Sequence, residues 1–92
     1  MLIKCASIPA IKIIQPKRHG DHRGFFSETY NFEALLKHGI DINFVQDNQS
    51  LSEKSGTLRG LHFQSPPFAQ DKLVRVTQGK ILDVAVDIRR GS

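Results

Sequence analysis

Residues 56–79 read GTLRGLHFQSPPFAQDKLVRVTQG, and this stretch decides the fold expected for the chain. Two β-rich runs flank a loop that opens with two prolines, which is a strong break signal. The first run carries Arg59, His62 and Gln64, and the second opens with Lys72. Polar groups this dense on strands cost free energy when they are buried without partners. We therefore predict that these side chains line a polar pocket; the alternative is that solvent covers them.

The spacing of Gly56, His62, Gln64, Lys72 and Gly79 resembles the first motif of the cupins. Metal-binding cupins carry a second His where Gln64 stands here, and a Glu where Lys72 stands. A charged lysine has no lone pair to offer, and an ammonium repels a divalent cation. The sequence therefore predicts acid–base chemistry in the pocket and no metal site.

One branch of the cupins matches the residues closely: RGLHFQ at 59–64, QDN at 46–48 and QDKLV at 70–74. These segments resemble the dTDP-4-dehydrorhamnose 3,5-epimerases, and the resemblance runs through nearly the whole chain. It implies a mainly β cupin jelly-roll with one short helix, and an isomerase of dTDP-rhamnose biosynthesis that acts on a dTDP-4-keto-6-deoxy sugar. No cofactor is implied, because epimerisation involves no redox change. Family members continue well beyond this length, so residues 1–92 are expected to form the N-terminal part of one epimerase domain.

The resemblance also implies the catalytic roles. A proton beside a ketone is weakly acidic, so its removal needs a positioned base and a group that stabilises the enolate oxygen. His62 is the expected base, Lys72 the enolate stabiliser, and Arg59 a phosphate ligand through its planar guanidinium. The alternative for His62 is a satisfied core histidine. Family members take the proton donor for the other ring face from a tyrosine in their second half, and Tyr30 matches no such donor.

Residues 21–28, DHRGFFSE, keep a family pattern of Asp, one residue, Arg-Gly, one residue, Phe, one residue, Glu. The resemblance implies that Arg23 grips the diphosphate and that Glu28 contacts the nucleotide. By the same resemblance, both residues reach the pocket of a neighbouring subunit on exchanged N-terminal strands. The resemblance therefore implies a homodimer. The alternative for the two residues is an ordinary surface ion pair, which contributes little stability.

A further polar group lies on the predicted strand 43–50. Gln46 and Asn48 share one strand face and offer the neutral donors and acceptors that orient a sugar. The resemblance adds Asp47 to these substrate-binding residues. The alternative is a polar face exposed to solvent. Asp83 and Asp87 are either partners of the site residues or solvated.

Hydrophobic periodicity and break signals predict seven strands and one helix. The strands are expected at 1–7, 11–15, around 25–30, and at 43–50, 56–64, 72–79 and 80–89, with a polar loop at 17–23. The helix is expected from Asn31, its N-cap, to His38, with Gly39 ending it and Phe32, Leu35 and Leu36 in the core. Because Arg59 and His62 point to opposite faces of a regular strand, a kink is expected at Gly60.

Composition limits the remaining possibilities. A chain of 92 residues makes one domain at most. Its net charge of +4 fits a phosphorylated ligand or a merely solvated basic surface, and its basic residues show no nucleic-acid motif. The absence of a long apolar run and of a signal-peptide pattern predicts no membrane span and a cytoplasmic location. Cys5 is expected to be a small buried or edge-strand filler.

Two other function classes stay open. The chain could be a non-catalytic module that binds a nucleotide sugar or assembles with other chains. It could also belong to a sister cupin that epimerises one carbon or moves the ketone.

Overall fold

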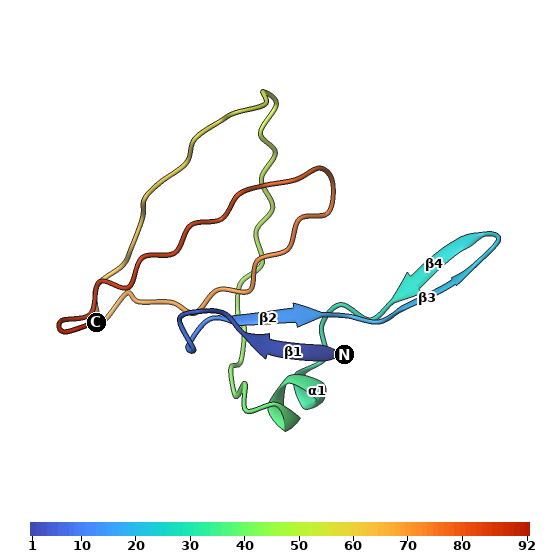
Figure 1. Ribbon diagram of the computed structural model, residues 1–92, viewed down its shortest axis with the longest axis horizontal. Coiled ribbons are helices and arrows are strands. Elements are labelled where there is room, and N and C mark those ends of the chain that lie inside the picture. The colour runs from blue at the N-terminus through green and yellow to red at the C-terminus, as the bar shows by residue number, and fades with distance from the viewer.

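The computed structural model describes residues 1–92 and contains four antiparallel strands, in two small sheets, and one short helix. The elements follow one another along the first part of the chain (Figure 1). They are β1 (Leu2–Cys5), β2 (Lys12–Gln15), β3 (Arg18–Asp21), β4 (Gly24–Ser27) and α1 (Phe32–Lys37). The mainly β, antiparallel character predicted from the sequence is therefore confirmed. Because α1 has six residues, no helix in the structure could cross a membrane.

The first hairpin pairs β1 with β2, so that Ile3 faces Ile14 and Cys5 faces Lys12. Its connection is closed by backbone hydrogen bonds, with the Ala6 amide donating to the Ile11 carbonyl at 2.9 Å. Ile3 and Ile14 are half-buried, whereas Cys5 is exposed at the end of its strand. The two predicted N-terminal strands are thus confirmed, although each is shorter than the expected run.

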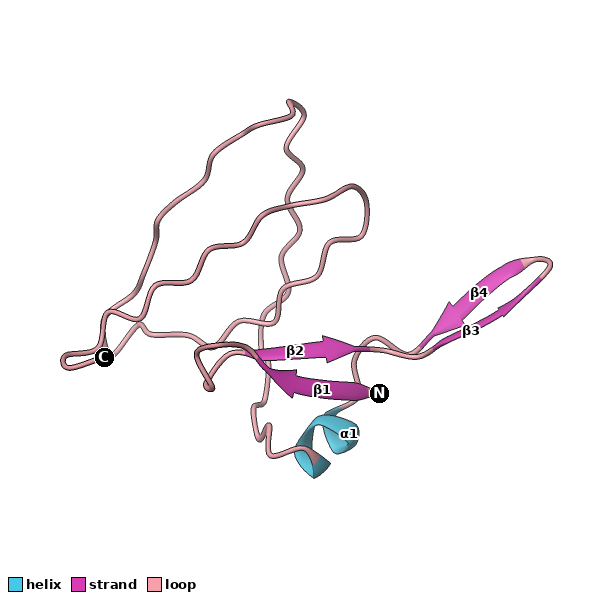
Figure 2. Ribbon diagram, in the orientation of Figure 1, coloured by secondary structure: helices cyan, strands magenta, loops and turns pink.

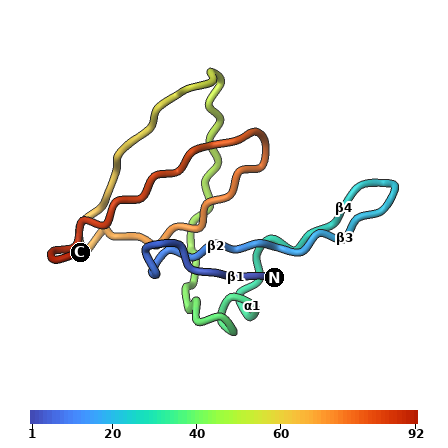
Figure 3. Tube along the Cα trace, in the orientation of Figure 1, coloured from blue at the N-terminus to red at the C-terminus, as the bar shows by residue number.

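The second hairpin corrects one prediction. The polar run 17–23 was expected to be a loop, but residues 18–21 form β3 and pair with β4. Ladder pairing overrides their low β propensity, and the Arg18 guanidinium also lies 4.3 Å from the centre of the Phe25 ring. The hairpin extends away from the rest of the chain (Figures 1 and 3).

The helix forms for the predicted local reasons. Asn31 is the N-cap, and its Oδ1 accepts from the Ala34 amide at 3.1 Å. Beyond the helix, Gly39 has φ +80° and its amide donates to the Leu36 carbonyl. Leu35 is 2 % exposed and is the only buried residue of the chain. Leu36 is instead 39 % exposed. Of the predicted apolar stripe, Leu35 is therefore the residue that is buried.

The four strands predicted after residue 42 do not form. The segments 43–50, 56–64, 72–79 and 80–89 contain no strand, and Figure 2 draws them as loops. Between residues 41 and 92, the backbone–backbone hydrogen bonds outside helices and strands are Phe68 to Ser65 and Ser92 to Arg89.

The physical reason is that a strand exists only beside a hydrogen-bonded neighbour. The chain makes 18 backbone–backbone hydrogen bonds. A folded domain of this size makes roughly 60, because it has about one hydrogen bond per residue and two-thirds of these join backbone groups. The apolar alternation of residues 82–88 is present, yet Leu82, Val84, Val86 and Ile88 are all exposed. These segments carry the sequence signal of strands without the pairing that makes strands.

Candidate functional site

Arg23 lies in the two-residue turn between β3 and β4, where Asp21 pairs with Gly24. Its Nη2 donates to Asp21 Oδ2 at 2.7 Å, and its backbone amide donates to Asp21 Oδ1 at 2.8 Å. These side-chain and backbone hydrogen bonds, in that order, lower the pKa of Asp21 below its usual value. The surface ion pair considered for Arg23 therefore exists, but its partner is Asp21 and not Glu28.

Glu28 follows the end of β4 and precedes the helix. Its Oε1 accepts a hydrogen bond from Asn31 Nδ2 at 3.0 Å. The strand expected around residues 25–30 is shorter than predicted, because β4 ends at Ser27 and does not include Glu28. Glu28 is instead tied to the residue that caps α1, which fixes the point where the hairpin joins the helix.

Arg59 is held by residues 51 and 52, which precede the 56–64 segment. Its Nε donates to Ser52 Oγ at 3.1 Å and its Nη2 to the Leu51 carbonyl at 3.4 Å. Between these residues the chain turns back, and Thr57 Oγ1 donates to the Lys54 carbonyl at 2.7 Å. The Nη1 group remains without a partner in the chain, so Arg59 keeps donors for an anion.

Gly60 separates Arg59 from His62 and has φ +107°, a value outside the extended strand region. The kink predicted at this glycine is thus confirmed, although no neighbouring strand makes it a β-bulge. An ideal Cβ at position 60 would lie 3.6 Å from the His62 amide nitrogen and 3.9 Å from His62 Nδ1. The imidazole therefore lies close over the glycine, where any side chain would meet it.

The remaining candidates are exposed and make no side-chain hydrogen bond within the chain: His62, Lys72, Gln46, Asp47 and Asn48. A mainly apolar depression of the surface lies elsewhere, lined by Ile8, Ala10, Ile11, Ala85, Val86, Asp87 and Arg89. None of the eight candidate residues lines this depression or the one formed by Met1, Leu2 and residues 14–18. Their assembly into one polar pocket stays a prediction.

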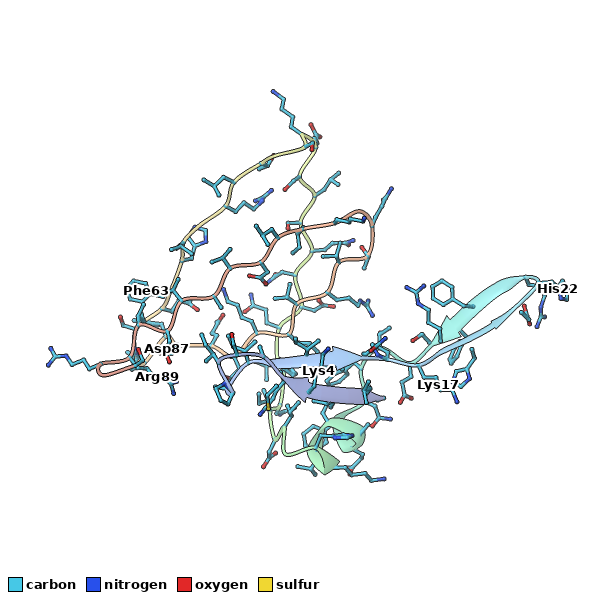
Figure 4. The ribbon with its side chains drawn as sticks, viewed as in Figure 1. Lys4, Lys17, His22, Phe63, Asp87 and Arg89 are labelled. Carbon is cyan, nitrogen blue, oxygen red and sulfur yellow. The ribbon has the colours of Figure 1, made fainter.

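A second Asp-x-Arg pair was missed at the sequence level. Asp87 accepts from the Arg89 backbone amide at 3.1 Å, from Nε at 2.9 Å and from Nη2 at 2.6 Å. Figure 4 shows the two side chains next to each other near the C-terminus. The Arg89 hydrogen bonds lower the pKa of Asp87 to about 2, and the same contacts raise the pKa of Arg89. The spacing itself, which also occurs at 21–23, is the signal that would have found it.

Comparison with known proteins gives the family. A family model described as dTDP-4-dehydrorhamnose 3,5-epimerase matches residues 5–92. A Sinorhizobium fredii protein of that name is 52% identical over 92 residues, which are 100% of this chain and 47% of the relative. A Salmonella typhimurium protein of the same name is 52% identical over 95 residues, 100% of this chain and 50% of the relative. One from Methanothermobacter thermautotrophicus is 49% identical over 86 residues, 94% of this chain and 45% of the relative.

The chain spans about half the length of the curated relatives it matches. No solved structure matches it. The family model covers the 21–28, 46–48 and 56–79 segments, which carry the candidate residues. On this match, the chain belongs to the dTDP-4-dehydrorhamnose 3,5-epimerase family.

Proposed function

We propose that this sequence is the N-terminal part of an enzyme that inverts the two carbons flanking the ketone of a dTDP-4-keto-6-deoxy sugar. The family match over residues 5–92 carries the proposal, because it includes every residue to which we assign a role. The relatives bear the name of this reaction over their whole length.

His62 removes the proton from the carbon beside the ketone, and the C–H electron pair forms the enolate double bond. The charge that develops on the ketone oxygen is stabilised by the Lys72 ammonium, a group already positive before the reaction begins. Reprotonation from the opposite ring face gives the inverted carbon. The donor for that step comes from a part of the enzyme beyond these 92 residues. A dry pocket would strengthen the contribution of Lys72, because charges interact more weakly in water.

The other candidate residues bind the substrate. Arg23 and Arg59 both keep free guanidinium donors and suit the diphosphate, whose charge the net charge of +4 also attracts. Glu28 contacts the nucleotide. The sugar is oriented by the short polar run Gln46, Asp47 and Asn48.

We propose that the complete domain is a cupin jelly-roll. The unpaired segments after residue 42 offer free backbone donors and acceptors, and the face made by Leu82, Val84, Val86 and Ile88 is uncovered. Further strands that pair with these segments would satisfy the free backbone groups and would help to cover the apolar face. We propose a cytoplasmic location for the enzyme.

We also propose that it works as a homodimer with exchanged N-terminal strands. The β3–β4 hairpin makes no strand–strand contact outside itself, and its Phe25 and Phe26 are 62 % and 72 % exposed. An isolated two-stranded hairpin is marginally stable in water. Packing against a second copy would cover both rings and would carry Arg23 into the neighbouring site.

The test uses a hybrid chain: residues 1–92 followed by the part of the Salmonella typhimurium relative that comes after its matched segment. This hybrid is expected to convert dTDP-4-keto-6-deoxyglucose to the 3,5-inverted product. His62→Asn should abolish turnover, and Lys72→Met should lower kcat by about a hundredfold or more, the typical loss for removing one oxyanion-stabilising donor. Lys80→Met removes the same charge from the turn after the second run and should leave kcat within about twofold. A folded hybrid that keeps its turnover after His62→Asn overturns the proposal.

Strand exchange is tested by mixing two impaired variants of the hybrid, Arg23→Ala and His62→Asn. If Arg23 serves the partner's site, half of the mixed dimers are heterodimers with one intact site each, so about a quarter of the activity returns. If Arg23 serves its own site, mixing restores nothing.

Assays of the hybrid chain also distinguish the alternative functions. The missing proton donor favours a binding module for the 92 residues taken alone. A binding module holds the nucleotide sugar without changing it. A sister enzyme gives a product inverted at one carbon or with a displaced ketone, which NMR of the product distinguishes.

A further inference from the structure

Asp21 makes more contacts to Arg23 than an ordinary surface ion pair requires. Its Oδ1 accepts from the Arg23 backbone amide, and its two oxygens lie 3.4 Å and 3.3 Å from Arg23 Nε. Its Oδ2 also accepts from Nη2 at 2.7 Å. The carboxylate is itself fixed, because Asp21 ends β3 and pairs with Gly24 across the turn. Asp21 therefore holds both the backbone amide and the guanidinium of Arg23.

The geometry leaves one edge of the guanidinium free. A guanidinium has five N–H donors, and Asp21 uses the edge formed by Nε and Nη2. Both donors of Nη1 and the second donor of Nη2 have no partner in the chain. These groups form the end fork, which can bind two phosphate oxygens in parallel. The side chain of Arg23 is 79% exposed, so the fork is open to a ligand.

We propose that Asp21 is a positioning residue that holds Arg23 by its Nε edge and thereby presents the end fork to the diphosphate of the nucleotide sugar. This inference rests on the proposed function, in which Arg23 binds that diphosphate. It explains why an acidic residue stands beside a phosphate site, where its charge alone would weaken anion binding.

Two effects of opposite sign act at this position. Losing the fixed orientation weakens diphosphate binding by about threefold to tenfold, the cost of ordering one long side chain. Losing the carboxylate charge strengthens binding by about threefold or less at such an exposed, salt-screened place. Asp21→Glu separates them, because it keeps the charge but moves the carboxylate one methylene away from the Arg23 amide. Asp21→Asn removes the carboxylate charge and with it the ion pair, and it leaves only a neutral amide oxygen to accept hydrogen bonds from Arg23.

The experiment measures the affinity of dTDP and of thymidine for the 92-residue chain and for the hybrid chain, each with four variants. These are Asp21→Glu, Asp21→Asn, Arg23→Ala and Asp87→Glu. Asp87 is the matched control, since it holds Arg89 by the same Asp-x-Arg contacts and has no role in the proposed site. Circular dichroism and the melting temperature of the hybrid verify that each variant folds.

Asp21→Glu should weaken dTDP binding by about threefold to tenfold, with Asp21→Asn weaker than the parent by a smaller factor. Thymidine, which carries no phosphate, should bind all variants alike, and Asp87→Glu should bind dTDP like the parent. In the hybrid, Asp21→Glu should raise KM with kcat within about twofold, as expected when uniform binding is lost.

Unchanged dTDP binding by Asp21→Glu, or tighter binding by Asp21→Asn, overturns the inference. If Arg23→Ala also binds dTDP like the parent, the fault lies in the proposed role of Arg23 itself. If Arg23→Ala binds more weakly while Asp21→Glu does not, only the positioning role of Asp21 fails.

Discussion

Gly60→Ala tests whether the backbone between Arg59 and His62 matters for catalysis. The added methyl would lie 3.6 Å from the His62 amide nitrogen and 3.9 Å from Nδ1, which are ordinary van der Waals distances. Steric clash is therefore a minor effect. The cost comes from φ +107°, which an L-alanine rarely adopts. A residue held in such a region is strained by about 1–3 kcal/mol.

This strain lowers the population of the observed backbone conformation by about 5- to 150-fold, since each 1.4 kcal/mol is a factor of about ten. If catalysis needs Arg59 and His62 in this relation, kcat/KM of the hybrid chain should fall by a factor in that range. The assay is steady-state epimerisation at several substrate concentrations, together with the melting temperature.

Gly39→Ala is the matched control. Gly39 has φ +80° and, like most of the other glycines, an open site for a Cβ, but it follows the helix and is not a candidate site residue. It should lower the melting temperature and leave kcat/KM within about twofold. A Gly60→Ala hybrid with the full kcat/KM of the parent would refute the reasoning, because the kink would then be unnecessary for the reaction.

Two further predictions rest on single contacts, and a third rests on the residue types at positions 64 and 72. The Asp87 carboxyl should titrate by NMR with a pKa of about 2, and Arg89→Ala should return it towards 3.8; a value near 3.8 in the parent chain contradicts the ion pair. Because this folded-state pKa is depressed, the stabilisation from the pair is full above about pH 4 and is lost as the pH falls through about 2. Asn31→Ala should destabilise the hybrid by about 1 kcal/mol in denaturant unfolding and speed amide exchange at Ala34, since it removes the helix cap. Asn31→Ser should recover most of that loss, and equal stability of all three proteins would exclude a capping role. Elemental analysis of the purified chain should find no stoichiometric zinc, iron or manganese, because Gln64 and Lys72 stand at the ligand positions; one equivalent of any of these metals contradicts the prediction.

The parts of the fold that sequence predicted well are those that local chemistry determines. The helix, its Asn31 cap and its end at Gly39 depend on residues within a few positions of each other. The kink at Gly60 follows in the same way from one glycine placed between two candidate residues, Arg59 and His62. Such features are readable in one sequence because their partners are its neighbours.

The parts that failed depend on which segments pair with each other. The alternation of residues 82–88 states which face of a strand would be apolar, but it contains no information on which segment pairs with it. The polar residues of β3 have low β propensity and therefore predict a loop. They form a strand because they pair with β4 across the turn. The candidate site has the same limitation: its residue types can be recognised in the sequence, whereas their mutual distances depend on how the segments pair.

The most direct test of the central claim is solvent exchange in heavy water with dTDP-4-keto-6-deoxyglucose. The hybrid chain should incorporate deuterium at both carbons beside the ketone, and His62→Asn should remove this exchange while the protein still binds dTDP. The 92-residue chain alone should bind weakly, exchange little or nothing and form no epimer. Undiminished exchange in the His62→Asn hybrid, or full turnover by the 92 residues alone, would contradict the account.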